Sequence, residues 1–151
     1  MITKSSGLSL VELLVVVAIL GILSAIGTVS YQGYVKSSKR SAAQNIVQQI
    51  ALAQTEEYSN SGSYVVNEAL ADGANLADAD CDASDSSDDL ERDLFSGDNI
   101  ITDNLRFEIC VIGNDSTYKV VAKEYNRKDP YEWSGCEIIL RRNSLPERLG
   151  C

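Results

Sequence analysis

The sequence contains no histidine, and none of its four cysteines stands in a CxxC pair. Without histidine, no Ser-His or Cys-His pair is available for nucleophilic catalysis, and the usual zinc sites reduce to an all-cysteine set without its usual close spacing. The glycines form neither a GxGxxG motif nor a Walker loop. We therefore expect a protein that is not an enzyme and that holds no cofactor.

The four cysteines are even in number and lie in the second half of the 151-residue chain, at Cys81, Cys110, Cys136 and Cys151. This arrangement predicts disulfides, and therefore export to an oxidising compartment. Four cysteines allow three pairings, and their spacing does not choose among them. In a domain of this size, each bridge contributes about 2 to 4 kcal/mol.

Charge is missing from Leu13 to Val35. A helix of this length reaches roughly 35 Å, against a hydrocarbon thickness of about 30 Å. The stretch is therefore predicted to cross a membrane, with the cysteines on the outer side. Glu12 lies at its start, and a carboxylate within hydrocarbon costs about 2.5 to 3.5 kcal/mol, so Glu12 needs either a partner or a place at the interface.

Proline is missing between Leu8 and Tyr58, and this absence favours one helix of about 50 residues. Beyond Val35 the apolar residues recur at helical spacing, which predicts an amphipathic second half over residues 36–58. These residues are Ala43, Ile46, Val47, Ile50, Ala53 and Tyr58. The segment "SNSGSY" at 59–64 is predicted to end the helix, and residues 65–104 to form a long connection with short helical turns.

Alternating patterns predict strands at 105–112 and 117–125, joined by a turn at "GNDS", and a further strand at 136–140. The tail is expected to return and to bring Cys151 near the sheet. A sheet with one apolar face needs a cover, and the amphipathic half of the helix is the large candidate. The predicted fold class is α+β, with a long N-terminal helix packed on a small antiparallel sheet.

The formal net charge is −9, and much of the acidity falls between Asp72 and Asp93. Six residues there have the spacing of an EF-hand calcium loop, although Ala83 replaces the glycine and the last position is aspartate instead of glutamate. They are Asp78, Asp80, Asp82, Ser84, Ser86 and Asp89. A weak calcium site and a solvated acidic surface both fit this pattern.

Basic residues cluster toward the end of the chain and suggest a second hypothesis, a module that holds DNA. They are Lys119, Lys123, Arg127, Lys128, Arg141 and Arg142. Tyr131 and Trp133 fit either an adhesive patch or, as is more usual for aromatic residues beside a disulfide, the core.

The segment "SGLSLVELLVVVAILGILSAI" resembles the N-terminal signature of the type IV pilins and the pseudopilins of type II secretion. The resemblance implies a leader at 1–7, cleavage between Gly7 and Leu8 by the prepilin peptidase, and methylation of the new amine. It also implies that Glu12 pairs with the amine of Leu8 on a neighbouring subunit.

The same resemblance implies a membrane and filament-core half at 8–35 and a globular head at 59–151. The function it implies is a structural subunit of a type IV pilus, held in the inner membrane as a precursor and assembled through an inner-membrane platform into an extracellular homo-oligomeric filament. The alternative is a minor pilin or pseudopilin that primes or tips a filament. In the family the C-terminal loop is commonly closed by a disulfide, so the expected pairs are Cys136 with Cys151 and Cys81 with Cys110.

Overall fold

The computed structural model describes residues 9–70, 74–79, 87–95, 100–101, 105–125 and 133–151. The chain divides into two compact units, Met1–Ser38 and Lys39–Cys151, which we call the first and the second unit. Helix α1 (Leu10–Ser61) contributes residues to both units. The remaining elements lie in the second unit: β1 (Glu68–Ala69), α2 (Ser87–Phe95), β2 (Phe107–Asn114), β3 (Thr117–Tyr125), β4 (Trp133–Arg141) and β5 (Glu147–Leu149).

Helix α1 is one uninterrupted helix of 52 residues, as its lack of proline predicts. At its start the carboxylate of Glu12 accepts a hydrogen bond of 2.9 Å from the backbone N–H of Ser9. At its end Gly62 takes a positive φ of 80°, and its N–H bonds to the carbonyl of Tyr58 at 3.0 Å. Glycine adopts this left-handed conformation without steric cost, so the predicted "SNSGSY" stop is confirmed.

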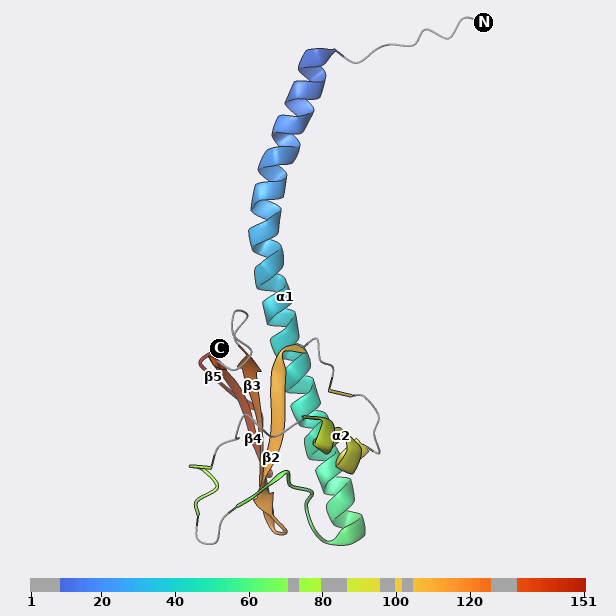
Figure 1. Cartoon of the computed structure of the whole chain (residues 1–151), viewed down its shortest axis with the longest axis vertical. Coiled ribbons are helices and arrows are strands. Elements are labelled where there is room, and N and C mark those ends of the chain that lie inside the picture. Colours follow the sequence, from blue (N-terminus) through green and yellow to red (C-terminus); the bar gives the residue numbers. More distant parts are fainter. Residues whose placement is uncertain (1–8, 71–73, 80–86, 96–99, 102–104, 126–132) are drawn as a thin grey trace, which may run out of the picture. The chain divides into compact units, whose positions relative to one another are not determined.

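The sheet has the order β1-β2-β3-β4-β5. Strands β2 to β5 pair antiparallel, and β1 pairs with β2 in parallel. The predicted hairpin is confirmed, and the side chain of Asn114 accepts hydrogen bonds from the backbone of Ser116 and Thr117 in its turn. The third strand begins at Trp133, earlier than expected, and the tail returns as β5 (Figure 1).

One face of this sheet packs against α1, which supplies the predicted cover. Ala43, Val47 and Ile50 of α1 are fully buried against strand residues such as Ile109 and Val120. Of the other predicted contact positions, Ile46 is buried, Ala53 is half-buried and Tyr58 is exposed. The predicted α+β class, a long helix on an antiparallel sheet, is confirmed.

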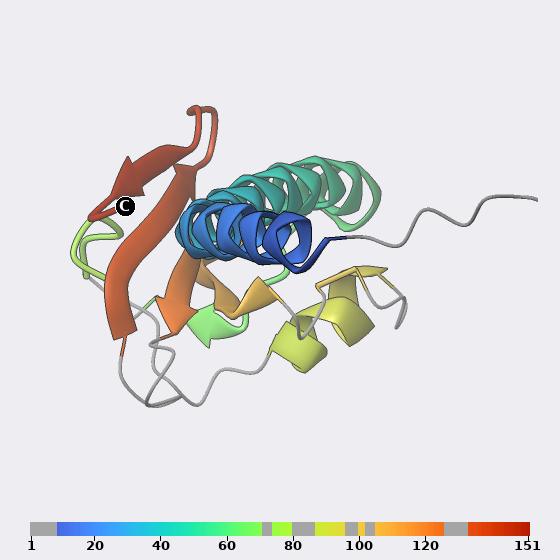
Figure 2. The ribbon, with the colours of Figure 1, turned by 90° about the horizontal axis from the view of Figure 1, so that it is seen from above.

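The opposite face of the sheet carries a smaller apolar cluster of Cys110, Ile112 and Val121. Half-buried Leu70, Leu76 and Ala79 pack against it, so the segment at 74–79 covers this face while α1 covers the other (Figure 2). The short helical turns expected in the connection correspond to the nine-residue helix α2, whose Leu90 is fully buried. The short strand β1 was not predicted.

Candidate functional site

The first stretch of α1 exposes apolar side chains on all sides. Every Leu, Ile, Val and Tyr from Leu10 to Tyr34 is between 49% and 76% exposed. This helix is long and apolar enough to cross a membrane, by length and composition. Because so large an apolar surface is not stable in water, it needs lipid or other protein chains to cover it.

Glu12 already has a partner within its own chain. Ser9 and Glu12 have the S-x-x-E spacing of a capping box, and the Glu12 carboxylate accepts the Ser9 N–H that the first turn of the helix leaves without a partner. The spacing could have revealed this contact from the sequence. Gly7 and Leu8 lie outside the described residues, so cleavage between them and the pairing of Glu12 with the Leu8 amine stay predictions.

The Cys136–Cys151 disulfide is present, with an S–S distance of 2.09 Å and 4.5 Å between the Cα atoms. Cys110 is buried on the sheet face opposite α1, as its strand position predicts, and it is disulfide-bonded. Its predicted partner, Cys81, lies outside the described residues, so the Cys81–Cys110 pair stays a prediction.

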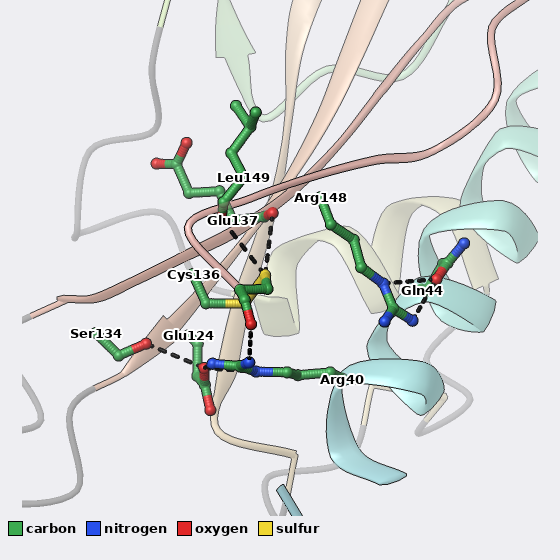
Figure 3. The surroundings of a disulfide bond; sticks show 9 residues. Arg40, Gln44, Glu124, Ser134, Cys136, Glu137, Arg148 and Leu149 are labelled. Atoms are coloured by element: carbon green, nitrogen blue, oxygen red, sulfur yellow. Dashed lines mark hydrogen bonds and ion pairs between the residues drawn. A yellow bond between two sulfur atoms is a disulfide. The ribbon is translucent and has the colours of Figure 1, made fainter. Parts of the chain in front are cut away.

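The Cys136–Cys151 segment is fastened to α1 by two polar contacts (Figure 3). Arg40 donates to the carbonyl of Cys151 at 2.6 Å and forms a half-buried ion pair with Glu124 at 2.8 Å. Arg148 of β5 donates to the side-chain oxygen of Gln44 at 2.5 and 2.9 Å. The disulfide segment is therefore held on the same side of the sheet as the helix.

The proposed calcium loop falls mostly on residues that the structure does not describe, namely Asp80, Asp82, Ser84 and Ser86. Asp78 is exposed, and Asp89 lies in the first turn of α2, where its carboxylate pairs with Arg92 at 3.0 Å. Within the described ranges, no cluster of candidate metal ligands is found. The weak calcium site stays a prediction.

The predicted basic set is wrong for two of its members. Lys119 and Lys123 are only 3% and 5% exposed, so neither presents its charge to a large ligand. Lys119 donates to the carbonyl of Ala79 in the segment that covers this face, and Lys123 pairs with Glu137 at 3.5 Å and lies over the ring of Trp133. Strand alternation placed both lysines opposite α1, but it did not show that another segment covers that face.

The other residues of the predicted basic set differ in exposure and in their partners. Arg141 is partly exposed and pairs with Glu147 at 3.2 Å, whereas Arg142 is exposed. Arg127 and Lys128 lie outside the described residues.

The two aromatic residues near the disulfide were expected to form either an adhesive patch or part of the core. Tyr131 lies outside the described residues. Trp133 is half-buried and stacks on Tyr125 at 4.7 Å, which favours a place in the core.

Tyr125 is also held by Glu108, whose carboxylate accepts its hydroxyl at 2.8 Å. Burial, and then this hydrogen bond, raise the pKa of Tyr125 above its ordinary value. The same carboxylate accepts the backbone N–H of Ser87 at 2.7 Å and thereby caps α2. Through these contacts Glu108 joins strand β3 to the start of α2 and so stabilises the fold.

Arg142 and Arg148 project from the β4–β5 hairpin toward α1. Arg142 donates to the carbonyl of Ser116 at 2.6 Å and lies 5.9 and 5.5 Å from the ring centres of Tyr58 and Tyr64. The two rings stack at 4.5 Å, and Tyr64 packs in turn on Tyr118. Arg148 was absent from the predicted basic set.

Comparison with known proteins agrees with these features. Residues 2–28 match the prokaryotic N-terminal methylation motif. Together with the exposed apolar helix and the sheet that packs on its second half, this match defines the class as the type IV pilins.

Residues 29–136 match the family described as "Type IV minor pilin ComP, DNA uptake sequence receptor", and the chain belongs to this family. A curated relative, the fimbrial protein EcpC of Eikenella corrodens, is 42% identical over 65 residues. This match covers 43% of the chain and 42% of that protein, so the chain spans less than half of the relative's length. No solved structure gives a significant match.

Proposed function

We propose that this pilin is processed between Gly7 and Leu8, is held in the inner membrane by residues 8–35 and then enters an extracellular filament by helix packing. The observation that carries the proposal is the apolar surface of α1 from Leu10 to Tyr34, which is exposed on all sides. Lipid covers this surface in the precursor, and the helices of other subunits cover it in the filament. The prepilin peptidase and the inner-membrane assembly platform are the partners that this route requires.

Glu12 gives this assembly its register. In a water-poor filament core, a carboxylate and an amine neutralise each other, whereas either one alone is costly. Glu12 therefore exchanges its hydrogen bond with Ser9 for the amine of Leu8 on a neighbouring subunit, or shares its two oxygens between them.

The test is Glu12→Ala, with Glu56→Ala as the matched control, because Glu56 is another exposed glutamate of α1. We expect Glu12→Ala to leave the protein in the membrane fraction and to remove it from sheared filaments. Glu56→Ala should leave the filament content unchanged. Normal incorporation of the Glu12→Ala chain would contradict the proposal.

A second function, DNA binding at the filament surface, is favoured by the match to a family of DNA uptake sequence receptors. The test is DNA binding by the full chain in detergent micelles, measured over a range of salt concentrations. Phosphate contacts predict an affinity that falls steadily with salt. Absence of DNA binding at low salt would contradict this second function.

A further inference from the structure

Four described cations of the second unit have a carboxylate partner: Arg40 with Glu124, Arg92 with Asp89 and Asp93, Lys123 with Glu137, and Arg141 with Glu147. These pairs are close to neutral, and they offer little attraction to a polyanion.

Arg142 and Arg148 differ from these four, because the partners found for them among the described residues are uncharged. Arg142 is held by a backbone carbonyl and two tyrosine rings, and Arg148 by the amide oxygen of Gln44. Both side chains are exposed. Each therefore keeps a full positive charge at the surface of a chain whose formal net charge is −9.

The two arginines lie along one side of α1. Their contacts on the helix, Gln44 and Tyr58, are 14 positions apart, which is close to four turns, so both positions fall on the same helix face. At about 1.5 Å per residue, these two positions are about 21 Å apart along the helix, or roughly six base steps of 3.4 Å.

Most of the helix surface between these two positions is uncharged. From Ser41 to Thr55, α1 carries no acidic or basic side chain. Glu56 and Glu57 precede Tyr58 but, at about 100° per residue, they lie on other faces of the helix. Gln48 lies one turn beyond Gln44 and is exposed, and its amide can donate to phosphate. A phosphate chain that follows this side of α1 therefore meets an arginine near each end and mostly uncharged polar groups between them.

The side chains are also held in place before any ligand arrives. A guanidinium has five donors in a fixed plane, and the contacts to Ser116, to Gln44 and to the rings use only some of them. Tyr58 is 39% exposed, so a ligand bound at Arg142 can also reach this residue. Pre-oriented side chains lose less conformational entropy on binding.

We propose that Arg142, with Tyr58 beside it, and Arg148 form the surface on which this chain holds the phosphate backbone of DNA. The inference rests on the proposed DNA-binding function and assigns it to particular residues. It replaces the predicted set centred on the buried Lys119 and Lys123.

The experiment uses the full chain in detergent micelles and a double-stranded DNA fragment. The variants are Arg142→Gln and Arg148→Gln, and the matched control is Arg92→Gln, which removes the same charge from an arginine paired with Asp89 and Asp93. Thermal unfolding of each variant shows whether the fold is retained. Arg142→Lys is added because it keeps the charge but loses the planar contact with the rings.

We expect Arg142→Gln and Arg148→Gln each to weaken DNA binding about tenfold and to reduce the slope of log affinity against log salt by about 0.9. Arg142→Lys should keep most of the salt slope, and Arg92→Gln should change the affinity less than about twofold. Folded Arg142→Gln and Arg148→Gln chains that bind like Arg92→Gln would overturn the assignment while leaving the DNA-binding function in place. Failure of the unsubstituted chain to bind DNA would instead contradict that function, and the inference with it.

Discussion

Residues Leu10–Ser38 and Lys39–Ser61 belong to the same helix, yet their side chains meet different surroundings. In the first stretch, large apolar side chains are exposed on every side, whereas in the second a stripe including Val47 and Ile50 is fully buried against the sheet. Helix propensity and the lack of proline account for the common backbone. The arrangement of apolar residues around the helix decides whether the partner is part of the chain or must come from outside it.

Among the substitutions that separate the two stretches, we expect the largest loss of stability when a buried isoleucine of the second stretch is shortened. Ile50→Ala removes a fully buried side chain from the contact with the sheet and should destabilise the second unit by about 2 to 5 kcal/mol. Thermal unfolding of the full chain in detergent micelles, followed by near-ultraviolet circular dichroism, measures the loss.

The matched control is Ile22→Ala in the first stretch, where the side chain is 63% exposed. It should leave the unfolding temperature of the second unit unchanged, because the sheet does not depend on it. If both substitutions destabilised the second unit equally, the claim that only the second stretch packs against the sheet would be wrong.

The disulfide is expected to have the next largest effect. Cys136 and Cys151 are 15 positions apart, and a bridge that closes a loop of this size stabilises by about 3 kcal/mol. Cys151→Ser should therefore lower the unfolding temperature of the second unit while membrane insertion of the first stretch stays the same. A loss of membrane insertion in this variant would show that insertion of the first stretch depends on the fold of the second unit.

Gln54 is a buried polar residue of the second stretch, and its hydrogen bonds are expected to stabilise the second unit. Its side-chain amide donates to the carbonyl of Val65 at 2.5 Å, and its oxygen accepts the N–H of the same residue at 3.0 Å. Gln54→Leu leaves both backbone groups without these bonds and should cost about 1 to 3 kcal/mol in the free energy of unfolding. Gln49→Leu, at an exposed position of the same helix, is the control, and a similar loss there would refute the assigned role.

The smallest expected effect concerns Tyr125. Because its pKa is raised in the folded state, the unfolded chain releases this proton first, near the ordinary value of 10.0. The stability that the neutral hydroxyl contributes is therefore present below that pH and is lost as the pH rises above it.

Tyr125→Phe should cost about 1 kcal/mol at neutral pH and reduce the fall in stability above pH 10. The remaining fall is attributed in part to Tyr118, whose pKa burial also raises. The unfolding midpoints of the unsubstituted chain and of Tyr125→Phe are measured over the alkaline range. If the midpoint falls equally steeply with pH in both, the raised pKa of Tyr125 is contradicted.

Much of the fold could be predicted because the long helix and the hairpin have local patterns. The lack of proline defined α1, and alternation at residues such as Phe107, Ile109 and Val120 defined the strands and the face toward the helix. Helix α2 was predicted only as short helical turns without a position, because acidic and polar residues dominate the segment, although Leu90 and Leu94 have the i, i+4 spacing of a helix face.

The basic surface could be predicted only in part. Sequence alternation correctly assigned Lys119 and Lys123 to the face opposite α1, but their burial depends on contacts with residues far away in the chain. Arg148 acquires its place against Gln44 of α1 only when β5 pairs with β4. Such contacts between distant segments have no local pattern in one sequence.

In the filament, we expect the exposed stretch of α1 to be covered by the helices of other pilin subunits. The most direct measurement places a photo-reactive amino acid at Ile22 and compares sheared filaments with membranes of the Glu12→Ala chain. We predict cross-links between Ile22 and the α1 helix of another subunit in filaments, and cross-links to lipid alone in the membranes. Filaments that contain the labelled chain but give no cross-link from Ile22 to another subunit would contradict the account.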